Sequence, residues 1–226
     1  MNKIKVLIPV RGGSKGLKGK HLQIVNNKPL IFWTLDQFIE ELGECIEIYI
    51  STDCPKISEL CLSKYDLKIL DRPSYLALDE TSTEDVLKTI AQSWNNSLNQ
   101  DELVIYASAC EINRKKGLIR EALDFYKKNN IDSFMYGEKS HKHIWTNSND
   151  KPKLLCNWME SYSPRQSSGS NYLIEHTGLI LITKLKYWLM GNRFGGKIFV
   201  KELDHLYRHV DIHHRIDLKI ASAILS

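Results

Sequence analysis

The stretch KIKVLIPVRGGSKGLKGKH, which runs from Lys3 to His21, joins an apolar run to a glycine-rich basic segment. The apolar run, residues 4–10, is too short for a helix of its own and is rich in β-branched side chains, which predicts a buried parallel strand. Pro9 lies near the end of that strand, where a missing N–H group is tolerated. The stretch therefore predicts a strand that leads directly into a glycine-rich loop.

The loop after this strand places basic side chains among glycines. The glycines are Gly12, Gly13, Gly16 and Gly19, and the basic residues are Arg11, Lys15, Lys18 and Lys20. Glycines let a ligand approach the backbone closely, and successive N–H groups form a hollow that binds anions. We interpret the loop as a triphosphate cradle in which Lys18 faces solvent. The alternative is a solvated basic turn between a strand and a helix.

Two familiar phosphate-binding loops do not match this stretch. A Walker loop requires G-x-x-x-x-G-K-[ST]. In this chain Gly13 and Gly19 are one residue too far apart, and His21 stands in place of the hydroxyl residue. The dinucleotide-binding pattern G-x-G-x-x-G is also absent. The loop therefore belongs to neither class.

The length and composition of the chain suit one α/β domain spanning residues 1–226. The chain has 226 residues, 42% of them hydrophobic, and a net charge of +4. This mild charge does not call for a nucleic-acid partner, because the cations gather at the N-terminal loop. No apolar stretch reaches the length of a membrane span, and residues 1–10 lack the features of a signal peptide. The five cysteines show no C-x-x-C spacing, which favours reduced thiols and a cytoplasmic protein.

Strand and helix patterns alternate along most of the chain. The predicted strands are residues 4–10, 46–50, 67–70, 103–107, 133–136, 178–183 and 210–212. The predicted helices are residues 31–42, 55–65, 83–95, 116–129, 184–190 and 217–225, with Ser82 or Thr83 as the N-cap of the third. This alternation predicts a doubly wound, mostly parallel sheet with helices on both faces, and ligands at the carboxyl ends of the strands.

Residues 139–171 depart from this alternation. They are polar and irregular, and Trp145, Trp158 and Tyr162 are scattered through them. Exposed aromatic side chains of this kind are often buried by a partner subunit. We interpret the segment as a small insertion that serves in dimerisation or as a lid. The alternative is a long loop that packs on its own domain.

A series of motifs follows the opening stretch in a fixed order. They are NKPLIFWTL at residues 27–35, STD at 51–53, RP, LA and D between 72 and 79, RQ at 165–166 and VDIHHRIDLKIA at 210–221. Together with the opening stretch they resemble the motifs of the CMP-sialic acid synthetases. These are cytidylyltransferases that include enzymes for related nonulosonic acids and, more distantly, the CMP-Kdo synthetases. The resemblance implies a nucleotide-diphospho-sugar transferase-like fold, a homodimer and magnesium (Mg2+) as cofactor.

The chain departs from the family pattern at three places. The segment YASACEINR, residues 106–114, stands where the sialic acid enzymes usually have QPTSPLR. Its start is closer to the YATA of the pseudaminic acid branch, but Cys110 and Glu111 replace that branch's PF. His213 stands where the second metal-side Asp is expected, and residues 176–178, HTG, take the place of a typical NG pair. The first departure lies where the sugar is expected to bind, so the identity of the sugar stays open.

The resemblance implies that CMP is transferred from CTP to the anomeric hydroxyl of a nonulosonic or sialic-type acid, with release of pyrophosphate. Catalysis of such a transfer is mainly positioning and electrostatic stabilisation, which explains a need for glycines and fixed cations. CTP and an acidic sugar are the expected partners. Two alternatives stay open. One is a nucleotidyltransferase with another acceptor, such as a Kdo-type acid, a sugar phosphate or a phosphonate. The other is a non-catalytic CTP-binding module.

Residue roles follow from the motifs and from side-chain chemistry. A guanidinium fork matches two phosphate oxygens, so Arg11 is the first choice for a phosphate clamp, with a surface ion pair as the alternative. The expected catalytic residues are Arg11, Lys15, Lys20 and Asp211. The expected nucleotide-binding residues are Arg11, Gly12, Gly13, Ser14, Lys15, Lys20, Arg72 and Thr83. The expected sugar-binding residues are Tyr106, Ser108, Arg165, Gln166 and His176.

Acidic residues near the predicted strand ends have competing interpretations. Asp211 is the metal candidate, because magnesium prefers one or two carboxylates together with waters and phosphates. We interpret His213 as structural, with a phosphate ligand or a base as alternatives. Asp217 is expected to be the N-cap of the last helix. Asp53 is expected either to bind the ribose or to cap the turn after it, and Arg72 either to bind nucleotide or to cap a helix.

Overall fold

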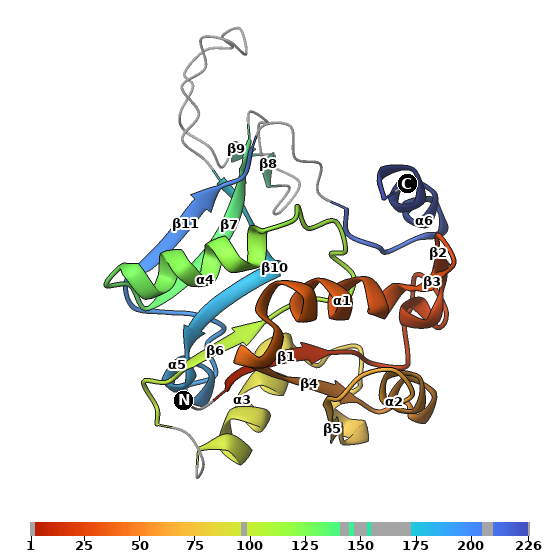
Figure 1. Ribbon diagram of the computed structural model, residues 1–226, viewed down its shortest axis with the longest axis horizontal. Helices are drawn as coiled ribbons and strands as arrows, with labels where there is room; N and C mark the ends of the chain where they lie inside the picture. The colour runs from red at the N-terminus through yellow and green to blue at the C-terminus, as the bar shows by residue number, and fades with distance from the viewer. Residues whose placement is uncertain are drawn as a thin grey trace, which may run out of the picture.

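A seven-stranded sheet forms the centre of the computed structural model (Figure 1). The structure describes residues 3–95, 99–140, 145–146, 153–154, 173–204 and 210–225. The strands are β1 (Ile4–Pro9), β4 (Ile46–Thr52), β5 (Lys68–Asp71), β6 (Leu103–Tyr106), β7 (Ser133–Lys139), β10 (Leu173–Lys184) and β11 (Ile198–Glu202). Their order across the sheet is β11-β7-β10-β6-β1-β4-β5.

Most neighbouring strands run parallel. β1 pairs in parallel with β4 and with β6, β4 pairs in parallel with β5, and β11 pairs in parallel with β7. β10 is the exception, because it runs antiparallel to both β6 and β7. The predicted doubly wound, mostly parallel sheet is therefore confirmed.

Helices cover both faces of this sheet. They are α1 (Leu30–Leu42), α2 (Pro55–Leu62), α3 (Thr83–Trp94), α4 (Leu118–Lys128), α5 (Leu185–Leu189) and α6 (Arg215–Ile224). Successive side chains of a strand point to opposite faces, and β1 shows this directly. Val6 and Ile8 pack in the core beneath α1, α2 and α4, whereas Leu7 packs in the core beneath α3 and α5. A third apolar cluster joins α6 to β2 (Ile24–Val25) and to the start of α1.

Local sequence explains where several elements begin and end. α1 ends at Gly43, whose φ of 52° favours glycine. The N-cap of α3 is Ser82 rather than Thr83: the Ser82 hydroxyl accepts from the backbone N–H of Asp85 at 3.1 Å, in a capping box. Short 3-10 turns lie at η1 (Lys20–Leu22), η2 (Gly43–Cys45) and η3 (Ser74–Leu76).

Two sequence predictions need correction, and one strand was not predicted. Residues 210–212 form no extended strand, because the only pairing there among the described residues is an isolated bridge between Glu111 and Asp211. The helix expected over 55–65 ends at Leu62. β11 was not predicted, since IFVKE is half exposed at a sheet edge and carries no strong alternation.

The predicted insertion, residues 139–171, is described only in part. β7 extends to Lys139, and β8 (Trp145–Thr146) pairs antiparallel with β9 (Lys153–Leu154). β3 (Lys28–Pro29) forms a similar small hairpin with β2 elsewhere in the chain. The rest of the insertion lies outside the described residues, so its role in dimerisation or as a lid stays a prediction. No helix in the described parts is long and apolar enough to cross a membrane.

The Arg114 guanidinium joins three elements that are far apart in the sequence. Its side chain is buried, and five hydrogen bonds satisfy its donors. The acceptors are the carbonyls of Leu179 (2.7 Å), Gly178 (2.9 Å) and Ser108 (2.9 Å), the Thr34 hydroxyl (2.9 Å) and the Gln37 side-chain oxygen (3.1 Å). Arg114 therefore ties α1, β10 and the segment after β6 to one another.

Replacing Arg114 with Lys should lower the free energy of unfolding by about 2–4 kcal/mol, because one ammonium cannot reach five oxygens and leaves buried carbonyls without donors. Urea denaturation measures the change. Lys116→Ala, at an exposed position nearby, is the control and should stay within about 0.5 kcal/mol of the unchanged protein. Equal stability of the two variants would contradict the role assigned to Arg114.

Candidate active site

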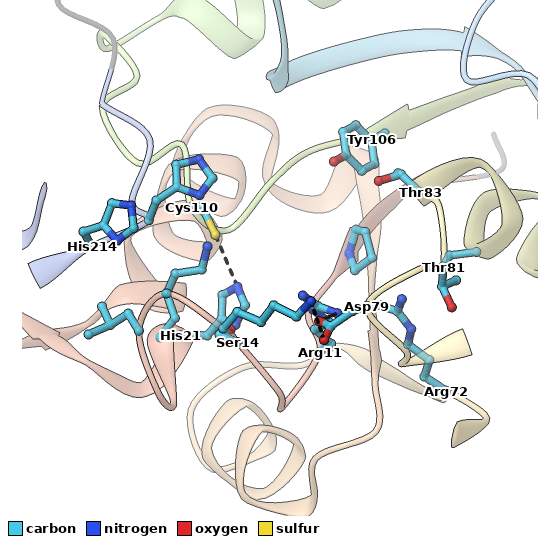
Figure 2. A pocket seen from close by; sticks show the side chains of 17 residues that line it. Arg11, Ser14, His21, Arg72, Asp79, Thr81, Thr83, Tyr106, Cys110 and His214 are labelled. Atoms are coloured by element: carbon cyan, nitrogen blue, oxygen red, sulfur yellow. Dashed lines mark hydrogen bonds and ion pairs between the residues drawn. The ribbon is translucent and has the colours of Figure 1, made fainter. Parts of the chain in front are cut away.

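A cavity of about 480 Å³ lies where β1, β5 and β6 end. Parallel sheets bind ligands at the carboxyl ends of their strands, so this position agrees with the sequence prediction. Its lining residues are Pro9, Arg11, Ser14, Lys15, Gly16, Leu17, Lys20, His21, Arg72, Asp79, Thr81, Thr83, Val86, Tyr106, Cys110, His213 and His214. In Figure 2, Arg72, Thr81 and Thr83 lie on one side and His21, Cys110 and His214 on the other.

The cavity brings together half of the predicted site residues. Those lining it are Arg11, Ser14, Lys15, Lys20, Arg72, Thr83 and Tyr106. Gly12 and Gly13 belong to the same loop, whereas Ser108, His176 and Asp211 are not among the lining residues. Arg165 and Gln166 lie outside the described residues. The grouping supports a nucleotide site, and the individual roles stay predictions.

Two glycines let the loop pack closely against its neighbours. A Cβ atom on Gly12 would lie 2.8 Å from Cβ of Cys54, and one on Gly16 would lie 2.5 Å from the His213 carbonyl oxygen. The Gly12 N–H also donates to the Asp53 carboxylate at 2.7 Å. Asp53 therefore holds the loop onto the end of β4, which explains an acidic residue at this strand end without invoking a ribose.

Arg11 and Lys15 converge on one carboxylate. Arg11 Nη1 lies 2.9 Å from Asp79 Oδ1, and Lys15 Nζ lies 3.0 Å from Asp79 Oδ2. Lys15 and then Arg11 lower the pKa of Asp79 below its ordinary value, because both cations favour the ionised carboxylate. Arg11 also donates to the Leu78 carbonyl at 3.2 Å. The Asp79 carboxylate thus pairs with both cations beside the cavity.

The segment before α6 packs against the phosphate-loop side of the cavity, which is the side that the glycine-rich loop after β1 forms. Lys20 Nζ donates to the Ile212 carbonyl at 2.8 Å. The N-cap of α6 is His214, not Asp217. Asp217 completes the capping box instead, because its carboxylate accepts from the backbone N–H groups of His213 (2.8 Å) and His214 (2.7 Å). Burial alone would raise the pKa of Asp217, but these two donors lower it.

Arg72 caps the end of a helix, which was one of its two interpretations. Its Nε donates to the Leu76 carbonyl at 2.7 Å, at the end of η3. The side chain also lines the cavity, and burial followed by the nearby Arg11 charge lowers its pKa, against the opposing effect of Asp53. Arg72 therefore fixes the loop that leads to Asp79, and it keeps one edge of its guanidinium beside the cavity.

Arg193, which the sequence did not indicate, lies beside a residue that lines the cavity. Its guanidinium lies 5.8 Å from the centre of the Tyr106 ring, its Nε bonds Glu84 at 2.9 Å, and its Nη1 bonds the Thr177 hydroxyl at 3.1 Å. It follows α5 in a loop without a recognisable motif, so only its contacts reveal it. Burial raises the pKa of Tyr106 to about 12, which keeps its hydroxyl protonated as a hydrogen-bond donor.

The segment after β6 explains the glycine in the unusual HTG stretch. A Cβ atom on Gly178 would lie 1.6 Å from Glu111 Oε1, so the Glu111 side chain occupies the space a larger residue would fill. The Ser108 hydroxyl accepts from the Cys110 N–H at 3.1 Å and shapes this turn. The buried His176 lies 3.6 Å from a Glu138 oxygen on β7.

Asp211 is the carboxylate that could hold a magnesium ion at the edge of the cavity. In the described residues, no group of three or more His, Cys, Asp and Glu side chains is arranged to hold a metal. Asp211 is partly exposed, and its Oδ2 lies 2.7 Å from Nε2 of His213, which lines the cavity. One such carboxylate fits an ion that phosphate oxygens and waters would largely hold, which is a common arrangement for magnesium.

Residues 5–159 match the model of a family described as cytidylyltransferase. The chain belongs to this cytidylyltransferase family. An N-acylneuraminate cytidylyltransferase of Streptococcus agalactiae serotype III (strain NEM316) is 30% identical over 148 residues, which are 64% of this chain and 35% of the relative. The Escherichia coli O18:K1:H7 (strain RS218 / NMEC) protein of the same name is 24% identical over 232 residues. The match covers 98% of this chain and 52% of the relative. These matches confirm the resemblance to the CMP-sialic acid synthetases.

One further relative and one solved structure are similar to this chain. A CMP-N,N'-diacetyllegionaminic acid synthase of Legionella pneumophila is 28% identical over 68% of each chain. The chain spans about a third to a half of the length of the curated N-acylneuraminate cytidylyltransferases it matches. A CMP:2-keto-3-deoxy-manno-octonic acid synthetase complexed with CTP superposes with a TM-score of 0.66 at 15% identity and covers 99% of this chain and 98% of its own. This likeness confirms the fold.

Replacing Asp79 with Asn should strengthen CTP binding about two- to fivefold, because Arg11 and Lys15 would no longer be paired with a competing anion. Isothermal titration calorimetry measures the dissociation constant. Asp101→Asn is the control, since Asp101 pairs with Lys186 away from the cavity. Weaker binding by Asp79→Asn would mean that the carboxylate positions the cations more than it competes for them.

Proposed function

We propose that this chain transfers CMP from CTP to the anomeric hydroxyl of a nonulosonic acid and releases pyrophosphate. The observation that carries the proposal is the convergence of Arg11, Lys15 and Lys20 on one cavity at the end of β1. Three cations at one cavity suit a triphosphate better than a singly charged ligand. Membership of the cytidylyltransferase family supports CTP as that triphosphate.

The chemistry proceeds by attack of the anomeric oxygen on the α-phosphorus. The new O–P bond forms, the bond to the β-phosphate breaks, and the hydroxyl proton is lost to the surroundings. Negative charge develops on the phosphoryl oxygens and on the departing pyrophosphate, and Arg11, Lys15 and Lys20 stabilise it. Magnesium, when bound, supplies further neutralisation of phosphate charge, and Asp211 is the residue that would hold it.

The acceptor side of the cavity is assigned to the segment after β6. Tyr106, which stays protonated, presents a hydroxyl donor to the sugar, and Arg193 holds its ring. Ser108, Arg165, Gln166 and His176 stay proposed sugar contacts. Relatives named for N-acylneuraminate and for N,N'-diacetyllegionaminic acid support an acidic sugar as the acceptor.

A homodimer and a cytoplasmic location are part of the same proposal. Trp145, in the small β8–β9 hairpin of the inserted segment, leaves 53% of its surface exposed. A large exposed aromatic side chain is typical of surfaces that a partner buries. Four reduced cysteines among the described residues are consistent with a reducing compartment.

Pyrophosphate release should require CTP, magnesium and an acidic sugar together. The assay supplies neuraminic, legionaminic, pseudaminic and Kdo-type acids one at a time, with a sugar phosphate and a phosphonate as alternative acceptors. Release with the sugar phosphate or the phosphonate alone would replace an acidic sugar as the proposed acceptor. Release with none of the four acids would contradict the proposed acceptor class.

Arg11→Ala should lower kcat/KM by about a hundredfold or more, because a cation aimed at developing phosphate charge is lost. The same pyrophosphate assay measures this change. Arg120→Ala is the matched control, since Arg120 lies on α4 away from the cavity and should leave kcat/KM nearly unchanged. Similar rates for Arg11→Ala and the unchanged protein would contradict the clamp role.

One observation favours a second candidate, a CTP-binding module without catalysis. His213 engages the Asp211 carboxylate at 2.7 Å, at the position where the family pattern has a second acid. His213→Asp tests this candidate. A module predicts tight CTP binding without turnover, and a gain of pyrophosphate release in the variant. The enzyme proposed above predicts that the unchanged protein already turns over and that His213→Asp alters its magnesium requirement.

A further inference from the structure

Two buried side chains meet at the wall of the cavity. Cys110 Sγ lies 3.3 Å from Nε2 of His21, although the two residues are 89 positions apart in the chain. Both side chains line the cavity, and each residue leaves less than a tenth of its surface exposed. Figure 2 shows the contact as a dashed line between the phosphate-loop side and the segment after β6.

The chemistry of the His21 ring fixes the direction of this contact. Burial first, and the Lys20 charge second, lower the pKa of His21 to about 3, so the imidazole is neutral. The backbone of Arg11 acts on the pKa in the opposite direction, but its effect is smaller than those of burial and Lys20. A neutral imidazole has one donor and one acceptor nitrogen, so the tautomer with its proton on Nδ1 accepts the Cys110 S–H proton at Nε2.

Cys110 is suited to be that donor. Burial raises the pKa of its thiol, although the Lys20 charge opposes the effect, so the sulfur keeps its proton. The backbone of Cys110 is itself held at both ends. Its N–H donates to the Ser108 hydroxyl at 3.1 Å, and its carbonyl accepts from the Ile212 N–H at 3.2 Å. The thiol therefore presents a fixed point on the acceptor side of the cavity.

We propose that His21 and Cys110 form a neutral brace that positions Arg11 relative to the acceptor segment, which makes both positioning residues for phosphoryl transfer. The inference rests on the proposed function and deepens it. The brace links the glycine-rich loop that carries Arg11, through the His21 imidazole, to the turn that carries Ser108 and Cys110. Phosphoryl transfer depends on placement of the reacting groups, so a small shift of the loop that bears Arg11 weakens contact with phosphate.

The brace differs from the other contacts around the loop. Asp79 holds the Arg11 side chain by charge, and a bound triphosphate would compete for that same cation. A neutral S–H to imidazole contact offers no charge to a phosphate and is shielded from water. It can therefore keep the backbone of the loop in place while the Arg11 side chain changes partner.

Cys110→Ala tests the brace through CTP binding, measured by calorimetry without any acceptor. We expect the dissociation constant to rise about three- to tenfold, and Cys110→Ser, which keeps a donor, to stay within about twofold of the unchanged protein. Cys61→Ala is the matched control. It removes another buried thiol, in the core beneath α2, and should lower thermal stability without altering CTP affinity.

Hydrogen exchange of the ligand-free protein gives a readout that does not depend on CTP. The amides of residues 11–20 should exchange faster in Cys110→Ala and in His21→Phe than in the unchanged protein or Cys61→Ala. The double variant should lose little beyond His21→Phe, because both changes remove one contact. Unchanged exchange, or additive effects, overturns the brace. Failure of the unchanged protein to bind CTP overturns the proposed function instead, and exchange still decides the brace.

Discussion

The buried Arg114 guanidinium is the interaction on which the arrangement of the site depends. A guanidinium is planar and always charged, so its burial is tolerated only when its donors all find acceptors in the right directions. Carbonyls from β10 and from the segment after β6, with two side chains of α1, supply those acceptors. This network holds the antiparallel β10 against the parallel part of the sheet.

The wall of the cavity after β6 depends on that anchoring. Gly178 accepts a bond from Arg114 and, having no side chain, leaves space for Glu111 beside it. The turn from Ser108 to Cys110 is then fixed by its own hydrogen bond, and the Cys110 thiol reaches His21. A charged group in the core thus determines where a neutral contact at the cavity forms.

Charge dominates one part of the cavity wall, and burial dominates another. Beside the glycine-rich loop after β1, the Arg11 side chain is partly exposed and the Lys15 side chain is largely exposed, and Asp79 pairs with both. Burial dominates elsewhere in the wall: it raises the pKa of Tyr106 at the end of β6, and it lowers the pKa of His21 in η1 so that the ring is neutral. Exposed cations suit a ligand that carries negative charge, whereas neutral buried groups suit a ligand that is placed by its shape.

The sequence by itself determined the opening strand, the glycine-rich basic loop, the alternation of strands and helices, and the family. Each is written in local spacing, such as the β-branched run of residues 4–10 or the ordered motifs. Only the tertiary structure decided which partners these residues take. In the structure Asp79 pairs with Arg11 and Lys15, and Arg193 lies beside Tyr106. Residues 210–212 form only an isolated bridge, and His21 contacts Cys110. Such contacts join residues tens of positions apart, and local spacing carries no record of which distant side chains the sheet brings together.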